Sequence, residues 1–122
     1  MCLWHIKLIH LLPRQQLLGQ HRECCALRGL GWGKKHSVVD YVFKYPYVKL
    51  YKYHEVVMDE MAIRGYRVNP IWHDPRWRGN KVGFADATEH ISISPIYPEH
   101  DDSYLNECLS NLKRKGVEIS YN

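Results

Sequence analysis

Arg22 and Glu23 form the part of the sequence with the clearest potential for chemistry. On a helix, at 100° per residue, they share a polar face with Gln15, Gly19 and Ala26. Gly19 and Ala26 leave little side-chain bulk beside the pair, so another group can approach the Glu23 carboxylate closely. Such a carboxylate can transfer protons or oppose a developing positive charge. The alternative interpretation is a surface ion pair, which is common for neighbouring Arg and Glu residues.

The opposite side of the same segment is apolar and carries Leu17, Leu18, Cys24 and Cys25, with His21 near its middle. His21, Cys24 and Cys25 are soft metal ligands, but no second pair of ligands at zinc spacing completes a site. We therefore predict no metal. His21 and His54 each lie within an apolar stripe, and we interpret them as core histidines with hydrogen-bond partners.

A glycine-rich basic loop follows this segment and contains Lys34 and Lys35. Its spacing matches neither the phosphate-binding loop of nucleotide hydrolases nor the dinucleotide-binding glycine motif. We therefore predict no nucleotide and no other small-molecule cofactor. The two lysines remain candidates for contacts with a DNA backbone, and the alternative is a loop with two solvated cations.

The charge of the chain is uneven. Residues 1–52 carry nine Lys and Arg against two acidic residues, whereas residues 53–122 carry eight against eleven. The basic half favours an anionic partner, nucleic acid first among the candidates, although a merely soluble surface accounts for it equally well.

Three helices are expected to position these groups, over about residues 13–28, over about 47–64, and from Asp101-Asp102 to about residue 115. Pro13 suits the first turn of the first helix and Gly29 its end. The second helix has an apolar stripe formed by Leu50, His54, Val57, Met58 and Met61. Residues 66–99 contain four prolines and several aromatic residues, and Ile91-Ser92-Ile93 alternates too briefly to build a sheet. The prediction is a mainly α, compact single domain over residues 1–122, with long ordered loops.

The four cysteines show no secreted disulfide framework, and the apolar N-terminal stretch is interrupted by His5, Lys7 and His10. No apolar run reaches the ~20 residues that a membrane span needs. These features predict a cytoplasmic protein without membrane contact, and we expect a monomer.

The order and spacing of several segments resemble those of the pyrimidine-dimer DNA glycosylase family. The resemblance begins with Gln15, Leu17 and the Arg22-Glu23 pair, and continues with the basic segment Gly33-Lys34-Lys35-His36. It ends with the segment from Tyr47 to Val68, which contains Arg64-Gly65-Tyr66. About half of the chain is covered, and the implied fold is a small helical domain with long loops.

The resemblance implies a DNA repair enzyme that acts on double-stranded DNA carrying cyclobutane pyrimidine dimers. In this family the N-terminal α-amine attacks C1′ of the damaged nucleotide and forms an imine, and β-elimination then cuts the strand. By position, Glu23 is the catalytic carboxylate, Arg22 contacts the lesion or a phosphate, and Gln15 is a polar DNA contact. The nucleophile is the amine of Cys2 if the initiator is removed, and of Met1 if it is retained. The alternatives are a DNA-binding protein with lost or altered chemistry on the same scaffold, and a small helical interaction module.

Overall fold

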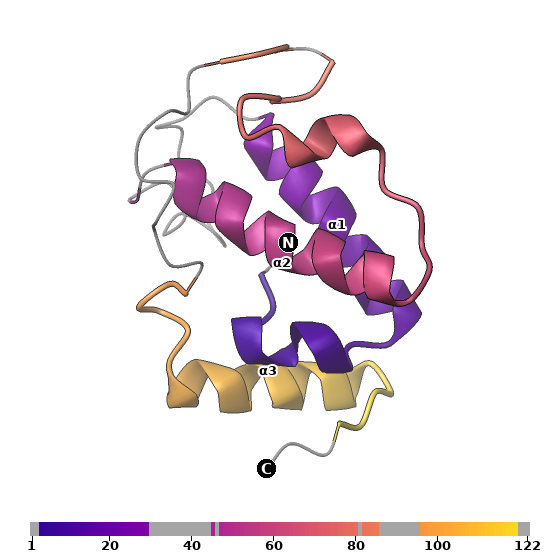
Figure 1. Cartoon of the computed structure of the whole chain (residues 1–122). Coiled ribbons are helices and arrows are strands. Elements are labelled where there is room, and N and C mark those ends of the chain that lie inside the picture. The colour runs from indigo at the N-terminus through magenta and orange to yellow at the C-terminus, as the bar shows by residue number, and fades with distance from the viewer. Residues whose placement is uncertain (1–2, 30–44, 46, 81, 86–95, 120–122) are drawn as a thin grey trace.

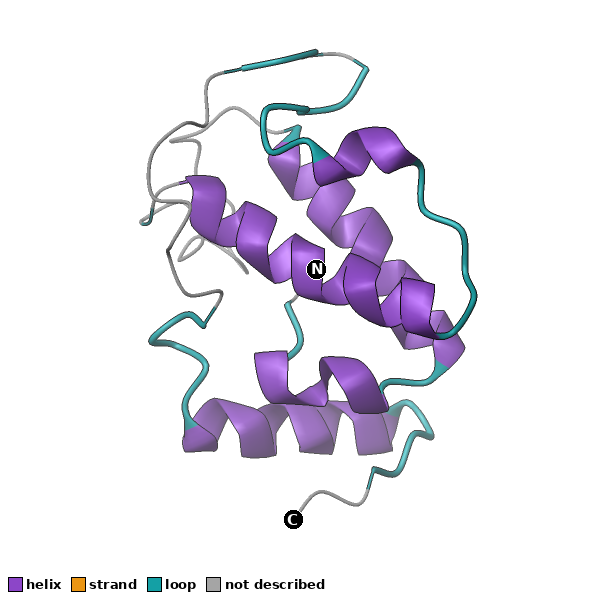
Figure 2. Cartoon of the chain, in the orientation of Figure 1, coloured by secondary structure: helices purple, strands orange, loops and turns teal. Residues whose placement is uncertain are grey.

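A computed structural model describes residues 3–29, 45, 47–80, 82–85 and 96–119. Within these ranges the chain is mainly helical and contains no strand, as the sequence predicts. The described residues form three α-helices and two short 3₁₀ helices, arranged as in Figures 1 and 2. α1 packs along α2, and the first 3₁₀ helix, η1, lies between α2 and α3.

α1 spans Arg14–Arg28, as predicted, with Pro13 immediately before its first residue. Leu17 and Cys24 are fully buried, while His21 and Cys25 are half-buried. Gly29 ends the helix in a right-handed conformation with φ of −85°. The need for glycine is steric here, because a Cβ at this position would lie 2.9 Å from the carbonyl oxygen of Arg78.

α2 spans Tyr47–Ile63 and confirms the predicted apolar stripe, all of whose residues are buried. Gly65 follows with φ of +83°, a left-handed conformation that glycine adopts without strain. The Arg64 side chain contacts the N-terminal segment: Nη1 donates to the Leu12 carbonyl at 2.6 Å and Nη2 to the His10 carbonyl at 3.1 Å. The end of α2 is thereby tied to the start of the chain.

α3 spans Asp102–Arg114 and begins where the two aspartates predict. The Asp101 carboxylate caps it by accepting from the Tyr104 amide at 2.8 Å. Leu105, Cys108 and Leu112 face the core. Lys113 and Arg114 lie in its last turn, where positive charge is favourable.

The N-terminal segment forms a 3₁₀ helix, η1, over Ile6–Leu11, which the sequence did not predict. Leu8 and Ile9 are buried, and they join the cluster that α1, α2 and α3 enclose. A second 3₁₀ helix, η3, spans Pro70–His73 and is capped by Asn69. In the segment before α3, Tyr97 is fully buried. The segment Ile91-Ser92-Ile93 lies outside the described residues.

No helix in the described part of the chain is both long and apolar enough to span a bilayer.

His100 lies in an aromatic cluster before α3 and is only 5% exposed. Its ring stacks on those of His5 and Tyr104, with centroid distances of 5.4 and 5.0 Å. Burial, with a smaller contribution from His5, lowers the pKa of His100 to about 4, whereas Asp101 opposes this shift. The folded protein therefore binds one proton fewer at this site than the unfolded chain between pH 6.5 and about 4.

We expect the free energy of unfolding to fall as the pH drops from 6.5 toward 4, by about 1 kcal/mol per pH unit for His100. Urea titrations at pH 7.5, 6 and 5 measure this slope. His100→Phe removes the titrating group but keeps an aromatic ring, so its slope should be shallower. His10→Phe changes an exposed histidine and should keep the wild-type slope. Equal slopes for wild type and His100→Phe would contradict the prediction.

Candidate active site and a second polar cluster

Glu23 lies two-thirds of the way along α1 and is half-buried. Its side chain borders a cavity of about 520 Å³. α1 contributes most of the cavity wall, and the start of the chain and the end of α3 complete it. The lining residues are Trp4, Gln15, Gln16, Gly19, Gln20, Arg22, Glu23 and Lys115. The sequence analysis thus placed Gln15, Gly19, Arg22 and Glu23 correctly on one face.

The Glu23 carboxyl group is in an unusual environment for an acidic side chain. Oε1 is buried, and no hydrogen-bond partner for it exists among the described residues. Burial raises the pKa of Glu23, and the positive charge of the amino terminus partly opposes this rise. A carboxyl group with a raised pKa exchanges protons more readily near neutral pH. The surface ion pair considered from the sequence is not present, because Arg22 and Glu23 make no salt bridge in the described structure.

Gln20 fixes the N-terminal segment against the same helix. Its Oε1 accepts from the Trp4 amide at 2.6 Å and lies 3.0 Å from the Tyr53 hydroxyl oxygen. The Tyr53 hydroxyl donates its one proton to the Trp4 carbonyl at 2.5 Å, and the Tyr104 hydroxyl donates to the Leu3 carbonyl at 2.5 Å. α1, α2 and α3 therefore each hold the backbone of residues 3 and 4 beside the cavity that Glu23 borders.

The cavity also has a positively charged rim. Arg22 and Gln15 are exposed on α1, where the sequence placed them. Lys115 joins them from the end of α3, with its ammonium group 5.3 Å from the centre of the Trp4 ring. The sequence analysis did not single out Lys115, because its place depends on how α3 packs. The predicted residues Met1, Cys2, Lys34 and Lys35 lie outside the described residues.

A second polar cluster surrounds Arg28, which the sequence analysis did not single out and which is fully buried. Nε donates to the Tyr47 hydroxyl at 2.7 Å. Nη1 and Nη2 donate to the backbone carbonyls of Trp72, Asp74 and Trp77 at 2.8–2.9 Å. Arg28 therefore joins α1 to α2 and to the segment after η3. The signal in the sequence is its spacing, because it follows His21 and Cys25 by seven and three residues on the same helix face.

Arg28 also determines which ring nitrogen of His54 carries the proton. Its Nη1 lies 3.0 Å from Nδ1 of His54, and because a guanidinium is always a donor, this nitrogen must accept. Burial lowers the pKa of His54, with Arg28 and His21 contributing further, so the ring is neutral and its single proton is on Nε2. Nε2 then donates to Nδ1 of His21 at 2.8 Å. His54 is thus a core histidine with hydrogen-bond partners, as predicted.

Cys25 completes a group whose composition resembles a metal site. Its Sγ lies 3.8 Å from Nε2 of His21 and 3.9 Å from Nε2 of His54, and the ligand atoms of the three residues fall within 4.8 Å of one another. A histidine that binds a metal usually donates its other N–H to an acceptor. At His54 the other ring nitrogen, Nδ1, faces the Arg28 guanidinium, which is itself a donor. Burial also raises the pKa of Cys25 to about 11, which disfavours the thiolate that binds a metal. The geometry therefore favours a hydrogen-bonded network over metal ligation.

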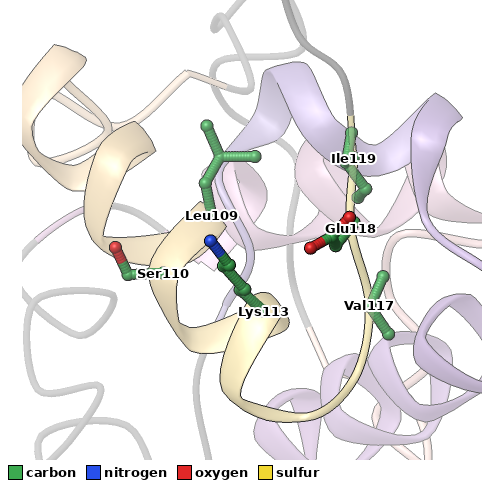
Figure 3. Close-up of a pocket in the computed structure, with 6 residues that line it drawn as sticks. All are labelled: Leu109, Ser110, Lys113, Val117, Glu118 and Ile119. Carbon is green, nitrogen blue, oxygen red and sulfur yellow. The ribbon is translucent and has the colours of Figure 1, made fainter.

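A further hollow of about 370 Å³ lies between the end of α3 and the segment that follows it (Figure 3). Its polar groups come from Ser110, Lys113 and Glu118, all of which are exposed. No histidine or cysteine lines it. Its polar groups are all solvated, so the Glu23 cavity is the better candidate for chemistry.

The fold and the Glu23 cavity define a small helical protein with a partly desolvated carboxyl group under a cationic rim, an arrangement suited to proton transfer on an anionic substrate. Residues 1–74 match the family described as pyrimidine dimer DNA glycosylase, so the chain belongs to that family. Comparisons with curated proteins and with solved structures gave no match. The match includes all of α1 and α2 and ends before α3.

Proposed function

We propose that the protein is a DNA repair glycosylase with abasic-site lyase activity, and that it acts on double-stranded DNA carrying cyclobutane pyrimidine dimers. The observation that carries this proposal is the half-buried Glu23 carboxyl group, with its unpartnered oxygen, in a cavity with a cationic rim. Family membership supports DNA as the substrate.

The nucleophile in this proposal is the α-amine of the chain, on Cys2 or, if the initiator is retained, on Met1. An α-amine has an ordinary pKa of ~8, against ~10.4 for lysine, so more of it is unprotonated at neutral pH. Its nitrogen forms a bond to C1′ while the glycosidic bond breaks, and the released base stays joined to its neighbour through the cyclobutane ring. Loss of a proton from the nitrogen and cleavage of the bond between C1′ and the ring oxygen O4′ then give the imine. The hydrogen bonds that hold Leu3 and Trp4 support this role, because they fix the backbone immediately after Cys2.

Glu23 is the proton-transferring group in this proposal. Its carboxylate opposes the positive charge that develops on the sugar as the glycosidic bond breaks. In the following β-elimination a proton leaves C2′ of the imine and the bond from C3′ to the phosphate oxygen breaks. A carboxyl group with a raised pKa suits both steps. The exposed groups of Arg22 and Gln15 would contact the DNA at the mouth of the cavity.

Borohydride reduction tests the proposed imine. With a duplex containing one cyclobutane thymine dimer, we expect a stable covalent adduct, which mass spectrometry should locate at the N-terminal residue. Acetylation of the N-terminus should abolish it. An undamaged duplex serves as the substrate control.

Lys115 is the informative rival nucleophile in this experiment, since its amine lies in the same cavity. Lys115→Gln should still give the adduct at the N-terminus. An adduct located at Lys115 would show that the assigned nucleophile is wrong. No adduct at all from the folded protein would exclude the imine mechanism.

A further inference from the structure

Residues 76–85 form a short hairpin after the segment that matches the family. Trp77 and Phe84 pair in an isolated antiparallel bridge. The Arg78 amide donates to the Gly83 carbonyl at 2.9 Å, and the Ala85 amide donates to the Arg76 carbonyl at 2.8 Å. Gly79 and Gly83 have φ of +101° and +75°, which make the tight reversal possible. Lys81 lies outside the described residues.

The base of the 76–85 hairpin is held against α1 and α2. The Trp77 carbonyl accepts from Arg28 at 2.8 Å and from the Tyr47 hydroxyl at 3.3 Å, and the Arg78 guanidinium lies 3.5 Å from the centre of the Tyr47 ring. The Arg78 carbonyl fits against Gly29 at the end of α1. Glu23 is five residues before Arg28 on that helix, a rise of about 8 Å. The hairpin is therefore fixed at the end of the helix that carries Glu23.

Phe84 is exposed to solvent, although it is aromatic and its backbone pairs with that of Trp77. The residue is 58% exposed, and its ring packs edge-to-face on that of Trp77 at 5.0 Å. The guanidinium of Arg76, whose side chain is 57% exposed, lies 5.5 Å from the centre of the same ring. One face of the Phe84 ring is therefore accessible to a planar partner from solvent.

The chemistry of the hairpin favours a nucleic acid as its partner. Residues 76–85 contain three cationic side chains and no acidic one, and Asp74 and Asp86 flank them. An exposed aromatic ring provides a stacking surface for a base, and a neighbouring guanidinium binds phosphate. Arg76 binds the Asp74 carboxylate through Nε at 3.2 Å and Nη2 at 3.1 Å, and both contacts are solvent-exposed, so a phosphate has to displace this carboxylate from the guanidinium.

We propose that the 76–85 hairpin is a second DNA-contacting element, in which Phe84 stacks on a base that has left the helical stack and Arg76 binds a nearby phosphate. The inference rests on the proposed function, because enzymes that act on bases disrupt the stack around their target. It assigns a substrate-binding role to residues outside the family match.

Equilibrium binding to a fluorescent duplex with one thymine dimer tests this inference. Because stacking on one base is worth ≈ 1–3 kcal/mol, we expect Phe84→Ala to weaken binding about tenfold. Phe84→Leu should weaken it similarly, because leucine keeps the apolar bulk but lacks the π face. Phe84→Tyr should retain the wild-type affinity. Arg76→Gln should lower the slope of log Kd against log salt concentration by about one.

Val82→Ala is the matched control, since Val82 is 51% exposed on the same hairpin. It should bind as the wild type does. Wild-type affinity for Phe84→Ala would overturn the inference while leaving the proposed function intact, and would point to a protein partner for this surface. Full affinity for Phe84→Leu would overturn the stacking role. Absence of DNA binding by the wild type would instead refute the proposed function itself.

Discussion

Replacing Glu23 by Gln should slow strand cleavage at a thymine dimer about a thousandfold while leaving DNA affinity within about threefold of wild type. General acid–base catalysis contributes ~10²–10⁴ to a rate, and a Gln amide cannot exchange a proton in the same way. The substitution is nearly isosteric, and Oε1 of Glu23 has no hydrogen-bond partner to lose among the described residues. Single-turnover cleavage and equilibrium binding on the same duplex measure the two effects separately.

Glu107→Gln provides a matched control, because Glu107 is an exposed glutamate on α3. It should cleave at the wild-type rate. If Glu23→Gln also cleaves within threefold of wild type, Glu23 does not transfer a proton in the reaction and the proposed mechanism fails. A wild-type protein that binds damaged DNA but leaves it uncut would instead identify a non-catalytic DNA-binding member of the family.

The helices were predictable because local signals specify them. The apolar stripe of α2, the cap of α3 at Asp101 and the glycines after each helix lie within a few residues of the structure that they determine. The same applies to the face of α1 that carries Arg22 and Glu23, since helical geometry alone brings those side chains together. The small residue Gly19 does open a cavity beside Glu23, as its position on that face indicates.

The residues that complete the site could not be predicted in the same way, because their partners are distant in sequence. Gln20 falls between the two faces of α1. Its burial is explained only by its contacts with Trp4 and Tyr53, which are distant in sequence. Lys115 reaches the Glu23 cavity because α3 packs near the start of the chain. Arg28 is a charged residue at the end of a helix, where solvent exposure is the usual expectation.

Arg28 is the residue whose loss should destabilise the fold most. We expect Arg28→Met to lower the free energy of unfolding by about 3–5 kcal/mol, a large part of the ~5–15 kcal/mol typical of a domain. Methionine fills a similar volume, but three backbone carbonyls and the Tyr47 hydroxyl oxygen then lose the donor that Arg28 provides in the interior. Urea unfolding at pH 7.5, followed by circular dichroism, measures the change.

Arg28→Lys distinguishes the shape of the guanidinium from its charge. A lysine ammonium keeps the charge, yet it has three donors on one nitrogen and cannot span Tyr47, His54 and the Trp77 carbonyl together. We therefore expect Arg28→Lys to lower the free energy of unfolding by more than half of the decrease that Arg28→Met causes. Arg67→Met, at an exposed arginine, should change stability by less than about 0.5 kcal/mol. A free energy of unfolding for Arg28→Met within about 1 kcal/mol of wild type would show that Arg28 does not join α1, α2 and the 76–85 hairpin. The inference that the hairpin holds Phe84 in a fixed position would then fail as well.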